Sequence, residues 1–135
     1  MWRYLLVCLT CLSPCVLANE CAPARDPSRI VTAGGSLTEI LYYLGEESRI
    51  VAVDTTSNFP AAASDLPSIG YVRALSAEGL LSLNPTLILG EDDMGPREVV
   101  EQVKRSGLEV VRVPEVQTAQ GIVDKVICIA SILSM

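Results

Sequence analysis

A tyrosine and an arginine, Tyr71 and Arg73, are the side chains of this sequence best suited to hold a metal centre. They follow Gly70 and stand directly before a short helix that is predicted to begin at Ser76. The chain contains no histidine, so the commonest metal ligand is missing. A phenolate oxygen is a hard, anionic donor that suits ferric iron. Because an unbound phenol has a pKa of about 10, ligation requires the metal or a nearby cation, such as Arg73, to favour the ionised form.

The chemistry of these side chains, taken alone, favours plainer roles. A tyrosine is more often a packing residue whose hydroxyl reaches water, and Tyr71 could be such a residue at the edge of a sheet. Glu78 lies in the first turn of the predicted helix, where a carboxylate complements the helix dipole. That effect would be enough to explain its presence.

Two other segments could bind ions, but simpler structures are expected for both. Gly34-Gly35-Ser36 leads into a helix and could offer free N–H groups to an anion. It lacks the G-x-G-x-x-G spacing of a dinucleotide site, so we expect a tight turn. Glu91-Asp92-Asp93 could bind a hard cation, but three adjacent carboxylates cannot all converge from one loop. We expect a solvated acidic loop there.

No arrangement of catalytic residues is visible in the sequence. Without histidine, neither a Ser-His nor a Cys-His pair can be built, and no nucleophile elbow is present. We therefore expect a protein that is not an enzyme.

Short apolar runs alternate with helical patterns along the chain. Strands are predicted near residues 29–33, 50–53, 87–89 and 110–113. A capping box of Ser36 and Glu39 predicts the start of the first helix, in which Tyr42 and Tyr43 are expected to be packing residues. The alternation predicts an α/β fold, with a parallel sheet covered by helices on both faces. Ligands of such sheets bind at the carboxyl ends of the strands, where the long loop of residues 54–74 carries Tyr71.

The last predicted helix, from residue 118 onwards, is apolar on more than one side. One face is formed by Val123, Val126, Ile127, Ala130 and Leu133, while Ile122, Ile129 and Ile132 point elsewhere. A helix that is apolar all round is expected to be buried.

The first 18 residues are predicted to be a cleavable signal peptide. Arg3 supplies a positive charge, the stretch from Tyr4 to Leu12 is apolar, and Val16-Leu17-Ala18 provides a cleavage site. The apolar run is too short for a membrane span, which needs about 20 residues. Residues 19–28 are predicted to be a flexible leader, and residues 29–135 a single α/β lobe.

The charge and cysteine content of the exported chain limit its partners. The full sequence has 10 basic and 16 acidic residues, a net charge of −6, which becomes −7 when Arg3 leaves with the signal. Such an acidic chain is not expected to bind nucleic acid. Cys21 and Cys128 remain after cleavage; a disulfide between them is permitted in an oxidising compartment, and two unpaired thiols are equally compatible with the sequence.

Three segments together resemble one protein family: Thr32–Ile40 (TAGGSLTEI), the block from Gly70 to Pro85, and Leu87-Ile88-Leu89. In this order and at these spacings they resemble the N-terminal lobe of periplasmic haem-binding proteins of ABC importers. These are the haem members of the cobalamin and siderophore binding-protein class. The resemblance runs from about Ile30 to about Val126.

The resemblance implies a function and a set of site residues. Family members have two α/β lobes joined by a long helix, with haem held between the lobes, and this sequence matches the first lobe without the linker helix or the second lobe. By this resemblance Tyr71 would be the axial ligand of ferric haem. Arg73 would assist the phenolate or pair with a haem propionate, and Glu78 would dock onto arginines of the membrane permease. The expected protein is a periplasmic monomer that binds haem and delivers it to the ABC permease.

Two alternatives stay open. The chain could be a siderophore or cobalamin carrier of the same class, in which Tyr71 would be a wall residue without a bond to iron. It could also be a truncated, nonfunctional lobe. Zinc and manganese carriers of related build rely on histidine ligands, which this chain lacks.

Overall fold

A computed structural model of the chain describes residues 20–135. The predicted signal peptide and its cleavage site lie outside the described residues. Within residues 20–135, no helix combines the length and the apolar character needed to cross a bilayer.

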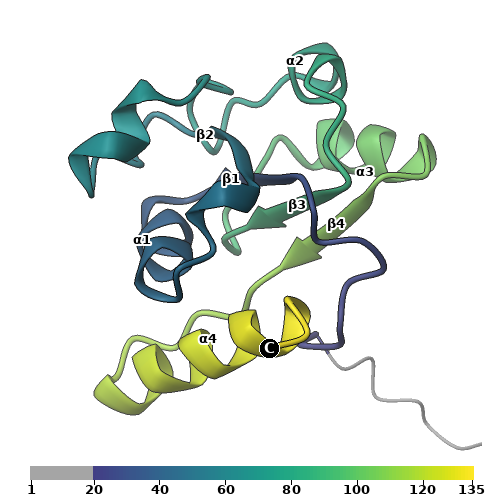
Figure 1. Ribbon diagram of the computed structural model, residues 1–135. Coiled ribbons are helices and arrows are strands. Elements are labelled where there is room, and N and C mark those ends of the chain that lie inside the picture. The colour runs from purple at the N-terminus through teal and green to yellow at the C-terminus, as the bar shows by residue number, and fades with distance from the viewer. Residues whose placement is uncertain (1–19) are drawn as a thin grey trace, which may run out of the picture.

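The described chain is built around one four-stranded parallel sheet (Figure 1). The strands are β1 (Ile30–Ala33), β2 (Ile50–Val53), β3 (Leu87–Gly90) and β4 (Glu109–Arg112), in the spatial order β2-β1-β3-β4. β3 runs in step with both neighbours, pairing Leu87 with Ile30 on one side and with Glu109 on the other. The predicted parallel α/β sheet is confirmed, as are the positions of its four strands.

Helices cover both faces of the sheet, as the continuous apolar strands require. The elements α1 (Gly35–Tyr43) and α4 (Ala119–Ile132) pack on one face, and α2 (Ala77–Ser82) and α3 (Arg97–Arg105) on the other. Short 3-10 turns follow α1 and β2, at Glu47–Arg49 and Ala61–Asp65. Successive strand residues serve opposite cores, since side chains alternate along a strand: Leu87 and Leu89 face the α1/α4 side, whereas Ile88 faces the α2/α3 side.

The segment before β1 is attached to the lobe, although it contains no helix or strand. A disulfide joins Cys21 to Cys128 of α4. Ala24 is buried, and its N–H donates to the carbonyl oxygen of Ile132 over 2.9 Å. Arg25 contacts the carboxylate of Glu109, with 3.3 Å between Nε and Oε2. The leader predicted at residues 19–28 is therefore held to α4 and β4 where the structure describes it.

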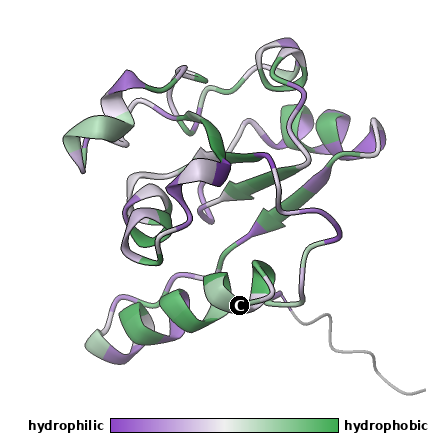
Figure 2. Cartoon of the chain, in the orientation of Figure 1, coloured by the Kyte–Doolittle hydropathy of each residue, from purple (hydrophilic) through white to green (hydrophobic). Residues whose placement is uncertain are grey.

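The last helix, α4, buries only one of its faces. Figure 2 shows apolar residues on the outside of α4 as well as along the central strands. The buried face of α4 carries Gly121, Lys125, Cys128, Ile129 and Ile132. Val123 and Ile127 are exposed, together with Ile122. The prediction that α4 is buried on all sides is wrong for the described chain, because only the face that meets α1 and the sheet has a partner there.

Candidate functional site

The loop that carries Tyr71 leaves the carboxyl end of β2 and is fixed to that strand. The N–H of Val53 donates to the carbonyl of Pro67, and the N–H of Ile69 donates back to the carbonyl of Val53, each over 2.9 Å. Two residues later the N–H of Thr55 donates to the carbonyl of Gly70, also over 2.9 Å. Gly70 has a φ of +85°, a backbone conformation that glycine adopts without strain. The backbone that leads to Tyr71 is therefore held by hydrogen bonds to Val53 and Thr55.

A tight turn then holds Tyr71 at the carboxyl edge of the sheet. The N–H of Ala74 donates to the Tyr71 carbonyl over 2.8 Å, which closes the turn. Val72 is buried in the core of the α2/α3 face, and its carbonyl accepts a 3.0 Å bond from the N–H of Gly95. The N–H of Leu75 donates to the Gly95 carbonyl over 2.9 Å. The side chain of Tyr71, at 45% exposure, is thus an accessible phenol on a backbone that is held on both sides.

Arg73 is paired with a carboxylate from the next loop along the edge. Its Nε donates to Oδ2 of Asp93 over 2.7 Å, and its Nη2 lies 2.6 Å from the same oxygen. The hydrogen bond to Asp93, and next the charge of Tyr71, raise the pKa of Arg73 above its ordinary value. Asp93 is therefore a candidate site residue that sequence reasoning missed.

The acidic loop after β3 is exposed at Asp92 and Asp93, as expected, but two arginines also hold it in place. Arg112 donates to the backbone carbonyls of Asp92 and Met94, the second bond measuring 2.7 Å. The carboxylate of Asp93 accepts a hydrogen bond from Arg73. The sequence did not indicate these arginine contacts, because Arg73 and Arg112 are each 20 residues away from Asp93 and Asp92.

Glu91 belongs to a second polar cluster at the same edge. The Nζ of Lys125 donates to Oγ of Ser36 over 2.6 Å, and that hydroxyl donates to Oε1 of Glu91 over 2.6 Å. Lys125 also lies 3.5 Å from Glu91 and 3.7 Å from Glu115, and its side chain is only 7% exposed. The cluster joins α1, α4 and the loops after β3 and β4. The lone basic residue on the buried face of α4 is therefore neutralised by carboxylates, as a buried charge requires.

The start of α1 differs from the predicted capping box. Gly34 is the N-cap residue and no side chain caps the helix, because Ser36 lies inside the first turn and is bonded to Glu91 and Lys125. The N–H of Gly34 donates to Asp54 over 3.1 Å and the N–H of Gly35 to Thr56 over 3.0 Å. These donors are occupied, so the glycines form the expected tight turn and not an anion site.

Asp54 anchors this turn to the loop after β2. It is 2% exposed, and its two oxygens accept bonds from Gly34, Ser57 and Thr56. Ser57 in turn bonds Thr38 of α1 over 2.7 Å. All buried side-chain polar atoms in the described chain have hydrogen-bond partners. The buried polar side chains at the carboxyl edge of the sheet are therefore all hydrogen-bonded.

A groove of about 800 Å³ lies between α1 and the first half of α4. Its walls include the apolar side chains of Ile40, Tyr43, Phe59, Val116 and Ile122. Tyr43 is 80% exposed there, so the prediction that it packs in the core is wrong, whereas Tyr42 does pack against the core. Tyr71 does not line the groove.

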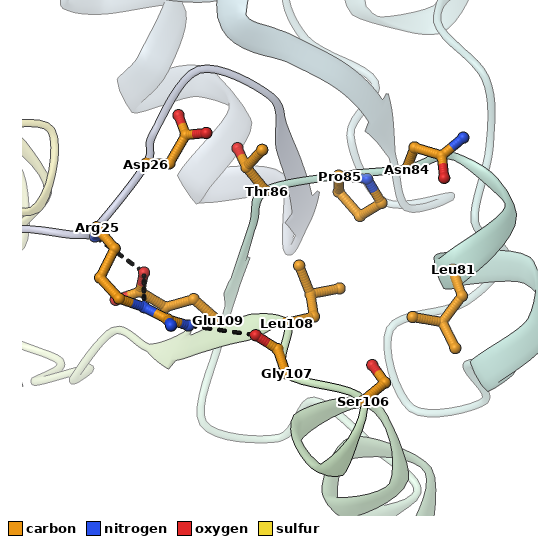
Figure 3. Close-up of a pocket in the computed structure, with 10 residues that line it drawn as sticks. All are labelled: Arg25, Asp26, Leu81, Asn84, Pro85, Thr86, Ser106, Gly107, Leu108 and Glu109. Carbon is orange, nitrogen blue, oxygen red and sulfur yellow. Dashed lines mark hydrogen bonds and ion pairs between the residues drawn. The ribbon is translucent and has the colours of Figure 1, made fainter.

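A second hollow, of about 450 Å³, lies at the opposite, amino edge of the sheet (Figure 3). Arg25 reaches across it to Glu109 and to the carbonyl oxygen of Gly107, 3.3 Å from Nη2. This hollow lies on the far edge from the loop of Tyr71, and Arg25 and Glu109 within it are paired with each other. It contributes nothing to the candidate site.

Two further observations complete the site. In residues 20–135 no three His, Cys, Asp or Glu side chains are grouped so that they could hold a metal ion. Glu78 is exposed in the first turn of α2, with Ser76 as the N-cap residue that accepts a 2.9 Å bond from Gly79. The ion pairs of the described chain do not involve Glu78.

Comparison with known proteins finds similar binding proteins for haem and for vitamin B12. The periplasmic haem-binding protein HutB of Vibrio cholerae is similar in structure, with a TM-score of 0.74 and 42% identity over 81% of this chain and 42% of that chain. A periplasmic haem-binding protein from Pseudomonas aeruginosa gives 0.69 and 39%, over 81% of this chain and 40% of that one. A vitamin B12-binding protein of Yersinia pestis is 28% identical over 88 residues, which are 65% of this chain and 31% of the relative.

The chain thus spans less than half the length of these relatives. The model of the periplasmic binding protein family matches residues 30–135, nearly the whole region that the structure describes. The proteins compared above are binding proteins. This chain belongs to the periplasmic binding protein family.

Proposed function

We propose that this chain is the N-terminal lobe of a periplasmic haem carrier that serves an ABC importer, and that Tyr71 ligates the ferric iron of the haem. The observation that carries the proposal is the place of Tyr71. Its half-exposed phenol stands at the carboxyl edge of the sheet, beside Arg73, on a backbone fixed by hydrogen bonds on both sides. A fixed ligand loses little freedom when it binds, which favours affinity.

The relatives support haem over other ligands of the class. Identity to the two haem-binding structures is 42% and 39%, against 28% to the vitamin B12-binding protein. The chemistry agrees, since ferric iron prefers a hard anionic oxygen and the histidine-free chain offers a tyrosine at the expected edge.

Titration with hemin tests the proposal. Tyr71→Phe keeps the aromatic ring and removes only the oxygen, so it separates coordination from packing. We expect the unaltered chain to bind hemin saturably and to develop a phenolate-to-iron charge-transfer band. Tyr71→Phe should lose the band and bind more than tenfold more weakly, a loss of about 1.4 kcal/mol or more. Tyr43→Phe is the matched control, because Tyr43 is also an exposed tyrosine but lies in the groove beside α1. If only Tyr43→Phe lost the band, the ligand would be Tyr43 and the assignment of Tyr71 would be wrong.

Cobalamin transport is the second candidate, because vitamin B12-binding proteins match 65% of the chain. In that case Tyr71 would be a wall residue, and Tyr71→Phe would change affinity little. A parallel titration with cobalamin distinguishes the two. Saturable binding of cobalamin, with hemin bound weakly and without a new band, would favour the cobalamin carrier.

We also propose that Glu78 is a docking residue for the permease. Its carboxylate is exposed and engaged in no ion pair found among residues 20–135, so it is accessible to arginines of a partner. Glu78→Lys, introduced at the matching glutamate of a full-length relative, should reduce importer-dependent uptake and leave hemin affinity unchanged. Unchanged uptake would show that Glu78 does not dock onto the permease and only complements the helix dipole.

The proposed location is the periplasm, reached by cleavage after Ala18. Homologues of the chain are periplasmic binding proteins. Mass spectrometry of the exported protein should find Asn19 as the first residue. Recovery of residues 1–18 on a cytoplasmic product would contradict this location.

A further inference from the structure

The ion pair between Arg73 and Asp93 has a role other than joining two loops. Two backbone hydrogen bonds of Gly95 already join the loop that carries Tyr71 to the loop after β3. The N–H of Gly95 donates to the carbonyl of Val72, and the carbonyl of Gly95 accepts from the N–H of Leu75. Val72 and Met94 also lie in the same buried cluster. These contacts do not depend on either charged side chain.

The pair is too exposed to contribute much to stability. The side chain of Arg73 is 61% exposed and that of Asp93 39%, and exposed ion pairs contribute little to folding. Its geometry does fix the direction of the guanidinium, because Nε and Nη2 both engage Oδ2 of Asp93, at 2.7 and 2.6 Å. The structural consequence of the pair is therefore a fixed orientation of Arg73, two residues after Tyr71.

We propose that Asp93 is a positioning residue that sets ligand specificity: it holds Arg73 for the oxygen of Tyr71 and withholds it from the carboxylates of the bound ligand. This inference rests on the proposed haem function. It also decides between the two roles open to Arg73, in favour of the phenolate.

Electrostatic repulsion explains why a carboxylate of the ligand would not bind at Arg73. A propionate that approaches Arg73 must compete with Asp93, whose carboxylate already lies against the guanidinium. It would also meet the negative charge of Asp92, which precedes Asp93 on the same loop. Like charges at short range disfavour this position. Haem should therefore bind with its propionates directed away from Arg73.

The test compares hemin with its dimethyl ester, in which both propionates are uncharged. Affinities for the two ligands are measured in the same detergent solution for the unaltered chain and for Asp93→Asn and Asp92→Asn. Asp92→Asn is the matched control, because it removes the same charge from the adjacent residue, whose backbone carbonyl and not its carboxylate is held by Arg112. Asparagine keeps the size of aspartate, so the loop is retained.

We expect Asp93→Asn to raise the preference for hemin over the ester by about threefold, the size of one exposed ion pair, because Arg73 becomes available to a propionate. Asp92→Asn should change the preference less, and the charge-transfer band of Tyr71 and the unfolding midpoint should persist in both variants. An unchanged preference in Asp93→Asn, or an equal change in both variants, would overturn the role of Asp93 while leaving the haem site intact. A large drop in the unfolding midpoint of Asp93→Asn would also overturn it, since Asp93 would then be structural. Failure of the unaltered chain to bind hemin would overturn both this inference and the proposed function.

Discussion

Removal of the disulfide between Cys21 and Cys128 should cost the lobe a large part of its stability. The two residues are 107 positions apart, so the bond closes almost the whole described chain into one loop. In the chain-entropy model a loop of this length stabilises the folded state by about 4.7 kcal/mol at 25 °C. Domains of this size are stable by only about 5–15 kcal/mol in total.

The contacts beside the disulfide indicate which part of the lobe should open first when the disulfide is removed. The segment that precedes β1 meets α4 through the disulfide, the bond from Ala24 to Ile132, and the 2.7 Å bond from Ser131 to the carbonyl of Cys21. Without the covalent link these few contacts must hold the segment alone. The amide of Ala24 should therefore exchange with solvent faster, while the sheet keeps its protection.

The assay is urea unfolding of a Cys21→Ser and Cys128→Ser double variant, followed by circular dichroism at 25 °C. We expect a loss of about 2–5 kcal/mol relative to the unaltered chain, the range for native disulfides in small secreted domains. The unaltered chain unfolded with a reductant should lose the same amount, which controls for the substitutions themselves. A loss below about 1 kcal/mol, well under that range, would refute the argument that this long loop constrains the unfolded chain.

Two further predictions concern the carboxyl edge of the sheet. Lys125→Met should destabilise the lobe by about 1–3 kcal/mol in urea unfolding, because Glu91 would lose its buried partner. Lys104→Met, which breaks an exposed pair within α3, should lose no more than about 1 kcal/mol; equal losses in the two variants would contradict the importance of burial. Gly35→Ala should destabilise by about 1–3 kcal/mol, since its Cβ would lie 2.8 Å from the carbonyl oxygen of Thr56. A thermal midpoint unchanged from that of the parent would show that the turn has more room than this distance allows.

The strands were predictable because each is a short apolar run bounded by turn residues. The predicted strands at 29–33, 50–53, 87–89 and 110–113 agree within one residue at each end with β1 to β4. Alternation of such runs with helices implies parallel strands, and this local pattern was sufficient for the fold class. The same logic placed the loop of Tyr71 at the carboxyl edge.

The polar contacts of the site were not predictable, because their partners are distant in the sequence. Ser36 and Lys125 are 89 residues apart, and Arg73 and Asp93 are 20 apart. The motif of Ser36 and Glu39 indicated a helix cap from local spacing alone, whereas Ser36 is bonded to residues from two other elements. One signal was present: Lys125 shares the face of α4 that carries Cys128 and Ile129, and a lysine on a buried face requires a nearby carboxylate.

The face that α4 presents to the core also depends on tertiary contacts. Apolar residues occur around most of this helix, so periodicity did not choose between its sides. The disulfide at Cys128 and the ion pairs of Lys125 turn one side inward. This leaves Ile122 and Ile127 exposed.

Resonance Raman spectroscopy of the hemin complex, excited within the phenolate-to-iron charge-transfer band, tests the central proposal most directly. Only a tyrosinate bound to iron should show enhanced tyrosine ring vibrations under this excitation. We predict that the unaltered chain and Tyr43→Phe show these vibrations and that Tyr71→Phe does not. Persistence of the vibrations in Tyr71→Phe, or their absence from the hemin complex of the unaltered chain, would contradict the assignment of Tyr71 as the haem ligand.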